Sequence, residues 1–221
     1  MNEDRKALRI GKNESTLSSQ EFYMIFGGVL LYGFLLNAIF ATFLTPVFAN
    51  MNPVILLVGY FVLALAGVFM SKSGGSLLSF IGYNFVVIPS GAILSVCLLA
   101  YTQQSIIAAL FIVAFDAGVM FLVSMMWPDK MLSMGRSLFI ALFVGIVAEV
   151  ICLLLGVSTG IFDFIFVIIF SGYLGYDFSV VAQYDKTVDN AIDSALDVYL
   201  DIINLLLRIL SIMNGSGKRR R

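Results

Sequence analysis

The stretch that decides the fold is Ala195–Met213, which reads ALDVYLDIINLLLRILSIM. At about 1.5 Å per residue it is long enough to cross a hydrocarbon core of roughly 30 Å. Its polar residues are Asp197, Asp201, Asn204 and Arg208. Their steps of four, three and four place them on one face of an α-helix. Because ionisable groups inside a membrane face protein or water rather than lipid, we predict that this helix lies at the centre of a bundle.

Composition predicts an all-α membrane protein. Hydrophobic residues make up 60% of the 221 residues and charged residues 12%, whereas a soluble domain carries about 25% charged residues. The chain has no histidine, which excludes catalysis by Ser-His or Cys-His pairs and metal sites built on histidine. Cys97 and Cys152 lie inside apolar runs and are expected to be buried small hydrophobes. We therefore expect neither an enzyme nor a bound cofactor.

Apolar runs separated by short polar segments predict seven membrane-spanning helices, with the C-terminal helix central. A polar tail is expected over 1–20, the seven-helix domain over 21–213 and a basic tail over 214–221. Pro89 and Gly91 interrupt the third span, where a kink is expected. The expected loops include 129–136 and 182–194. The expected spans are 22–43, 54–70, 77–101, 105–126, 137–155, 161–181 and 195–213.

Basic residues predict the orientation. The N-terminal tail carries four, the loops after spans two, four and six carry one, two and one, and the other loops carry none. The positive-inside rule places the N-terminus in the cytoplasm. Seven spans then put the C-terminus outside, although its four basic residues favour the inside; we favour seven full spans. Short loops and the absence of a signal peptide predict the cell membrane of a prokaryote.

Four acids lie well inside the expected spans: Asp116, Glu149, Asp177 and Asp201. Asp177 and Asp201 belong to consecutive antiparallel helices, at depths of roughly 6 and 9 Å from their shared end. Two carboxylates that meet in a low dielectric cannot both ionise cheaply, so the pair is expected to share a proton near neutral pH. Fully ionised, it would offer hard oxygen ligands to Ca²⁺. The alternative is that separate hydroxyls satisfy each acid, with Tyr173 or Tyr199 as candidates.

The other acids leave two interpretations open. Asp116 and Glu149 either line an ion or proton path or are structural, each paired with a hydroxyl or with the other. Asp163 and Asp197 lie nearer the helix ends and are expected to be interfacial and solvated, and Asp197 is also a candidate for the ion path.

The last two spans carry a resemblance. Leu174-Gly175-Tyr176-Asp177, followed by Val198-Tyr199-Leu200-Asp201-Ile202-Ile203-Asn204-Leu205, resembles the Bax inhibitor-1 family, especially its bacterial members. The resemblance implies seven helices with the last one central, and a pH-dependent calcium leak in which Asp177 and Asp201 are sensor and gate. Lys72 stands where the family often has an arginine that latches the aspartates. The latch candidates are Lys72, Asn204 and Arg208.

Three functions follow in order of preference. The first is a pH-sensitive leak for Ca²⁺ or another cation. The second is a non-conducting regulator that binds another membrane protein, such as a membrane protease. The third is a proton-coupled transporter that uses Asp116 or Glu149 together with the aspartate pair. The lipid bilayer is the expected environment, and nucleic-acid binding is not expected because no soluble domain presents the basic tails.

Overall fold

In the computed structural model, which describes residues 16–218, helices account for nearly the whole chain. The chain divides into two compact units. The first comprises Met1–Ala100 and Tyr184–Tyr199, and the second comprises Tyr101–Gln183 and Leu200–Arg221. The prediction of an all-α protein is confirmed for the described residues.

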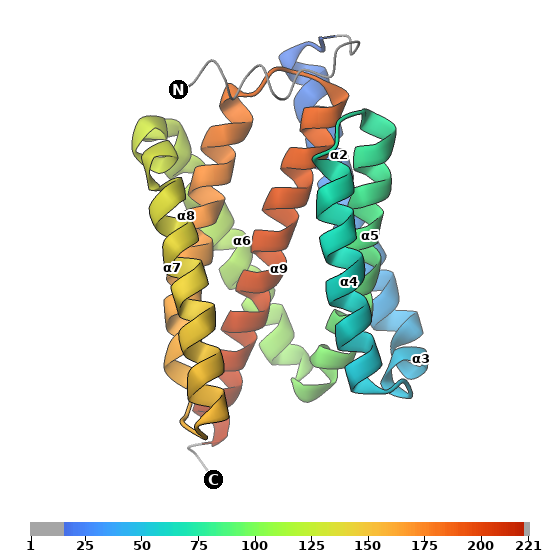
Figure 1. The fold of residues 1–221 in the computed structure, drawn as a ribbon, viewed down its shortest axis with the longest axis vertical. Coiled ribbons are helices and arrows are strands. Elements are labelled where there is room, and N and C mark those ends of the chain that lie inside the picture. The colour runs from blue at the N-terminus through green and yellow to red at the C-terminus, as the bar shows by residue number, and fades with distance from the viewer. Residues whose placement is uncertain (1–15, 219–221) are drawn as a thin grey trace. The chain divides into compact units, whose positions relative to one another are not determined.

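The first unit contains the N-terminal helices and the start of the last helix. Its elements are α2 (Ser19–Ile39), the π-helix η1 (Phe40–Leu44), α3 (Thr45–Ala49), α4 (Pro53–Ser71), α5 (Ser76–Cys97) and the 3₁₀-helix η2 (Leu98–Ala100). The second unit contains α6 (Gln103–Met126), α7 (Pro128–Leu154), α8 (Gly160–Gln183) and most of α9 (Val188–Lys218) (Figure 1).

Local sequence explains where several helices begin. Ser18 and Glu21 form a capping box, with the Ser18 backbone N–H donating to Glu21 Oε2 at 2.9 Å. Asn52 caps α4, whose first residue is Pro53, and Thr102 caps α6. Between α4 and α5 the chain turns at Gly74 and Gly75, which have φ values of 89° and 102°. Only glycine adopts this left-handed backbone without a steric penalty.

Six helical segments are long and apolar enough to cross a membrane within residues 16–218. They are Ser19–Ala49, Pro53–Ser71, Ser76–Ala100, Gln103–Met126, Pro128–Leu154 and Gly160–Gln183. Six of the seven expected spans are thus found as helices of sufficient length. Helix α9 falls outside this set because of the polar stripe that opened the sequence analysis, and its crossing and its central position stay predictions.

Helix bounds differ from the prediction at several places. The segment between the expected spans 22–43 and 54–70 is largely helical, because η1 and α3 continue the helix to Ala49. The helix α5 contains Pro89 within its bounds, and the kink expected there stays a prediction. The expected loop 129–136 is the start of α7, where Pro128 occupies the first turn and Asp129 favours the helix dipole. The expected loop 182–194 shrinks to 184–187, since α9 begins at Val188 and extends to Lys218.

The terminal tails lie mostly outside the described residues. Of the expected N-terminal tail 1–20, only 16–20 are described, and α2 begins inside it at Ser19. Of the expected basic tail 214–221, residues 214–218 continue α9.

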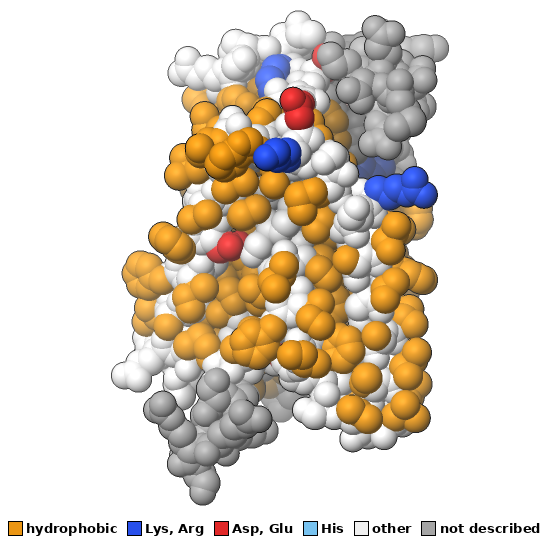
Figure 2. Space-filling view, turned by 90° about the vertical axis from the view of Figure 1, so that its left-hand side faces the viewer, with side chains coloured by type: hydrophobic (Ala, Val, Ile, Leu, Met, Phe, Trp, Pro, Cys, Tyr) orange, Lys and Arg blue, Asp and Glu red, His pale blue; other side chains and the backbone are white. Residues whose placement is uncertain are grey.

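Each unit packs one pair of helices closely. The helices α4 and α5 lie side by side in the first unit, and α7 and α8 do so in the second (Figure 1). Glycine allows the approach in both units: a methyl group added at Gly67 would lie 2.5 Å from the Gly82 carbonyl oxygen, and one added at Gly135 would lie 2.5 Å from the Tyr176 ring. Hydrophobic side chains cover most of the face in Figure 2, and charged ones gather mainly toward its upper end.

Candidate functional site

The predicted pair of carboxylates lies in the second unit, on α8 and α9. Asp201 is buried, with 7% of its surface exposed, and Asp177 is half-buried. Tyr173 precedes Asp177 by one helical turn and lies within electrostatic range of both carboxylates. Each of the two acids also has an interaction partner.

A half-buried ion network lies further along the same two helices. Arg208 of α9 binds Glu149 of α7 through two parallel contacts, Nη1 to Oε1 at 2.6 Å and Nη2 to Oε2 at 2.9 Å. Its Nη1 also lies 3.0 Å from Asp163 Oδ1 of α8. The guanidinium stands over the Phe166 ring at 4.2 Å, a cation–π contact. Ser211 completes the network by donating to Asp163 Oδ2 at 2.6 Å.

This network corrects one expectation and resolves another. Asp163 is not solvated, because its side chain is only 13% exposed and is bound to both Arg208 and Ser211. Glu149 is paired with Arg208, not with Asp116. The signal for Asp163 was present in the sequence: the antiparallel register that places Tyr173 near Asp201 also places Asp163 near Arg208 and Ser211.

The remaining candidate residues of the second unit are Asp116 and Asn204. Asp116 is half-buried on α6 and faces Ser171 of α8. Its Oδ2 atom is buried without a hydrogen-bond partner among the described residues. Asn204 donates its amide to the Leu200 carbonyl of its own helix at 2.8 Å, a bond that joins no other helix. Its role in a latch therefore stays a prediction without support from this contact.

The first unit holds the other latch candidate, Lys72. Its Nζ atom binds both carboxylate oxygens of Asp197, at 3.0 and 2.8 Å. The two side chains are 31% and 33% exposed, so Asp197 is an ion-paired residue at the surface and not merely a solvated one. The lysine thus joins the end of α4 to α9 through Asp197, which the sequence analysis placed in the ion path.

Two more acids of α9 contact the same hairpin of α4 and α5. Ser71 donates to Asp193, and Ser79 donates to Asp189 at 2.5 Å. Both hydroxyl–carboxylate pairs are buried. These pairs were not predicted, because polarity places both acids in the expected loop 182–194; their spacing of four residues, continued by Asp197, is the signal in the sequence for a helical face.

Comparison with known protein families identifies the family of this chain. A family model described as the inhibitor of apoptosis-promoting Bax1 (Bax1-I) matches residues 18–218. The chain belongs to the Bax inhibitor-1 family. The match spans all the helices described above, which confirms the resemblance seen in the motifs around Asp177 and Asp201. A search of the curated proteins found no match.

As a Bax inhibitor-1 family member, the chain is a multi-pass membrane protein, but its described residues gather no metal cluster. Residues 16–218 contain no group of three or more Asp, Glu or Cys side chains placed to hold a metal ion.

Proposed function

We propose that this Bax inhibitor-1 family member is a pH-sensitive leak for Ca²⁺ or another cation, gated by Asp177 and Asp201. The observation that carries the proposal is that Asp177 of α8 and Asp201 of α9, both in the second unit, each lie within electrostatic range of Tyr173. Carboxylates inside a membrane protein are rare and often mark ion or proton pathways. Family membership supports the same class of function.

Proton sharing explains how such a pair would gate. In a low dielectric, two neighbouring carboxylates favour a state with a single shared proton, which holds them together. Loss of that proton leaves two like charges, which repel each other and attract a divalent cation. Gain of a second proton removes the attraction for cations. The pair thus changes both its spacing and its charge over a narrow range of pH, and Tyr173 supplies a hydroxyl that can donate to either acid.

The ion network of Arg208 weighs against the transporter alternative. Glu149 is engaged by a bidentate contact with Arg208, and such charge-assisted contacts fix the carboxylate in one geometry. A proton carrier must bind and release its proton in each cycle. We therefore assign Glu149 to the structure of the second unit and keep Asp116 as the remaining acid of a proton path.

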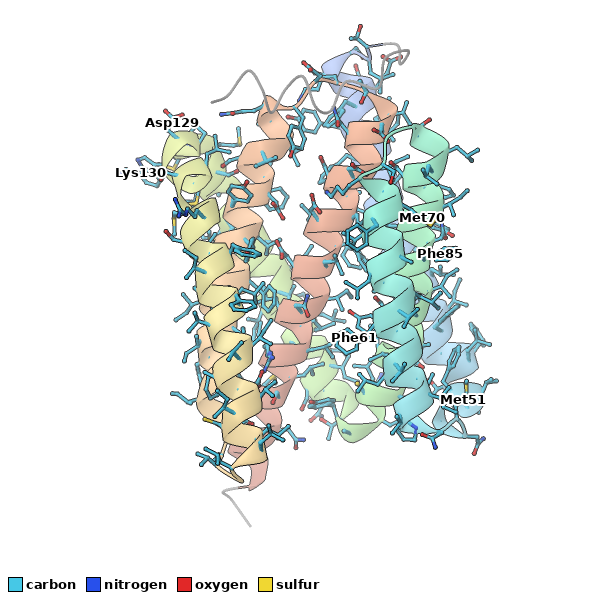
Figure 3. The ribbon with its side chains drawn as sticks, in the orientation of Figure 1. Met51, Phe61, Met70, Phe85, Asp129 and Lys130 are labelled. Atoms are coloured by element: carbon cyan, nitrogen blue, oxygen red, sulfur yellow. The ribbon has the colours of Figure 1, made fainter. Side chains whose placement is uncertain are left out.

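Flux measurements test the proposal. Purified protein in liposomes is assayed for Ca²⁺ entry from pH 5 to 8, together with Asp177→Asn and Asp201→Asn. The control is Asp129→Asn, an exposed acid at the start of α7 (Figure 3). We expect pH-dependent flux in the unmodified protein and the control, and a lost or displaced pH dependence in both dyad variants.

Two results would overturn the proposal. One is flux no greater than that of empty liposomes at every pH, with folded protein, which would favour the non-conducting regulator. The other is an unchanged pH profile in both dyad variants, which would place the gate elsewhere. Tyr173→Phe refines the positive result, since removing the shared hydroxyl should shift the midpoint without abolishing flux.

A further inference from the structure

Three acids of α9 form a row against the ends of α4 and α5 in the first unit. Asp189, Asp193 and Asp197 are four residues apart, so they lie on one helical face. Each has its own partner on the hairpin: Ser79 for Asp189, Ser71 for Asp193 and Lys72 for Asp197. We call these six residues the α9 clasp.

The charges of the clasp do not balance. With all three acids ionised, Lys72 is the single cation among the six residues, and it binds Asp197 directly. Asp193 stands in the middle of the row, only 4% exposed, and its partner is a neutral hydroxyl. The charged groups of the first unit that act on Asp193 are Lys72, Asp189 and Asp197. Its ionisation therefore places a charge in a buried position between two others of the same sign.

We propose that Asp193 is a second proton-sensing group, separate from the Asp177 and Asp201 pair, and that its protonation strengthens the docking of the start of α9 on α4 and α5. A protonated Asp193 keeps its bond to Ser71 and removes the repulsion along the row. An ionised Asp193 gains stability by reaching water, which loosens the clasp. The proposal goes beyond the gate of the proposed function and does not depend on ion conduction.

The acidity of Asp193 fits this role. The residue precedes the expected span 195–213. Burial raises its pKa from 3.8 to about 6, and Asp189 and Asp197 add to the rise, while Lys72 and Ser71 act against it. Because the pKa is higher in the docked state, its contribution to docking is complete below pH 3.8 and is lost as the pH rises through about 6. The sensor therefore works between mild acid and neutrality.

Hydrogen exchange of the α9 amides around Asp193 measures docking directly. The full-length protein is exchanged in detergent micelles between pH 5 and 7.5, and rates are corrected for the intrinsic effect of pH. We expect the protection of the amides of residues 189–197 to fall about tenfold from pH 5 to pH 7.5 in the unmodified protein. Linkage gives about this value for one carboxyl group that is mostly protonated at the low end of the range and ionised at the high end. Asp193→Asn should hold its protection constant, since an amide does not titrate.

Matched variants separate the clasp from other causes. Asp189→Asn keeps Asp193 and should retain the pH dependence. Ser71→Ala removes a donor to the ionised carboxylate and should move the midpoint to higher pH. Asp177→Asn should leave the exchange over 189–197 unchanged even where it alters flux. An unchanged pH profile in Asp193→Asn, or a profile abolished by Asp177→Asn, would overturn the proposal.

Discussion

At the scale of the residue, Arg208 shows how one side chain sets the surroundings of others. It carries a bidentate contact to Glu149 and a second contact to Asp163, and it stacks on Phe166. Arginine suits this place because its planar fork matches a carboxylate and its weak hydration tolerates an apolar site. Because Arg208 is the cation that binds both Glu149 and Asp163, the network depends on this one residue.

We expect Arg208→Met to destabilise the protein by about 3 kcal/mol, because both carboxylates would remain in an apolar site without their cation. Arg208→Lys should recover part of this loss, since lysine restores the charge but not the fork. Unfolding by heat or denaturant in micelles measures both changes. Lys130→Met, at an exposed position at the start of α7 (Figure 3), is the control. Equal stability of Arg208→Met and the control would contradict the role assigned to the network.

At the scale of the element, the crossing of α4 and α5 depends on two glycines. A methyl group at Gly82 would lie 2.5 Å from the Gly67 carbonyl oxygen and 2.7 Å from the Ser71 backbone nitrogen. Met70 and Phe85 border the crossing (Figure 3). Both obstacles are backbone atoms, so the helices must separate to accept a side chain.

We expect Gly67→Ala and Gly82→Ala each to lower the free energy of unfolding by about 2 kcal/mol, the usual effect of overpacking. Gly59→Ala on the same α4 helix is the control, because a methyl group there meets nothing within 4 Å. This change should be neutral or slightly stabilising, as alanine favours a helix by up to about 1 kcal/mol over glycine. Loss of stability in the control alone would refute the importance of the crossing.

The helices also show which parts of the fold can be predicted from an apolar sequence. Long apolar runs predict the spans well, since the bilayer fixes their length. Polar segments next to them were assigned to loops, yet 129–136 and 188–194 are helical. The bounds of these helices depend on helix-start residues such as Pro128 and on tertiary contacts such as the Ser71–Asp193 bond. A hydropathy profile contains no information about either.

The site was predicted unevenly for a related reason. Asp177 and Asp201 stand out because an acid is rare inside an apolar run and because a motif surrounds each of them, and their role as a pair stays a prediction. The pairing of Asp163 with Arg208 and of Lys72 with Asp197 was missed because each acid lies near the end of an expected span, where polarity carries little information. Ion-pair partners of this kind can be identified only when the register between the neighbouring helices is known.

At the scale of the whole molecule, the path of α9 decides the topology. Within the second unit, Asp201 lies within electrostatic range of Tyr173, while Ser211 binds Asp163. The helix α9 therefore runs antiparallel to α8 over the segment from Tyr173 to Asp163, roughly 15 Å at 1.5 Å per residue. This is about half of the hydrocarbon thickness, and a full seventh crossing by α9 stays a prediction.

We expect the N-terminus to lie in the cytoplasm and the C-terminus outside. Alkaline phosphatase joined after Lys218 should be active, and green fluorescent protein at the same place should be dark. Fusions in the turn between α4 and α5, at Gly74, should give the opposite pair of signals and serve as the control. A fluorescent C-terminal fusion would instead indicate a re-entrant α9 and six complete spans.

The polar stripe of α9 has a consequence for biogenesis. With Asp197, Asp201, Asn204 and Arg208 on one face, this segment is a poor substrate for the translocon by itself, since each charged residue near the bilayer centre disfavours insertion. Insertion would become favourable once Glu149 and Asp163 are already in place to receive Arg208. Because α9 leaves the ribosome after α7 and α8, its insertion would then depend on their correct folding, and a copy with a defective α7 or α8 would present an uninserted segment to membrane proteases.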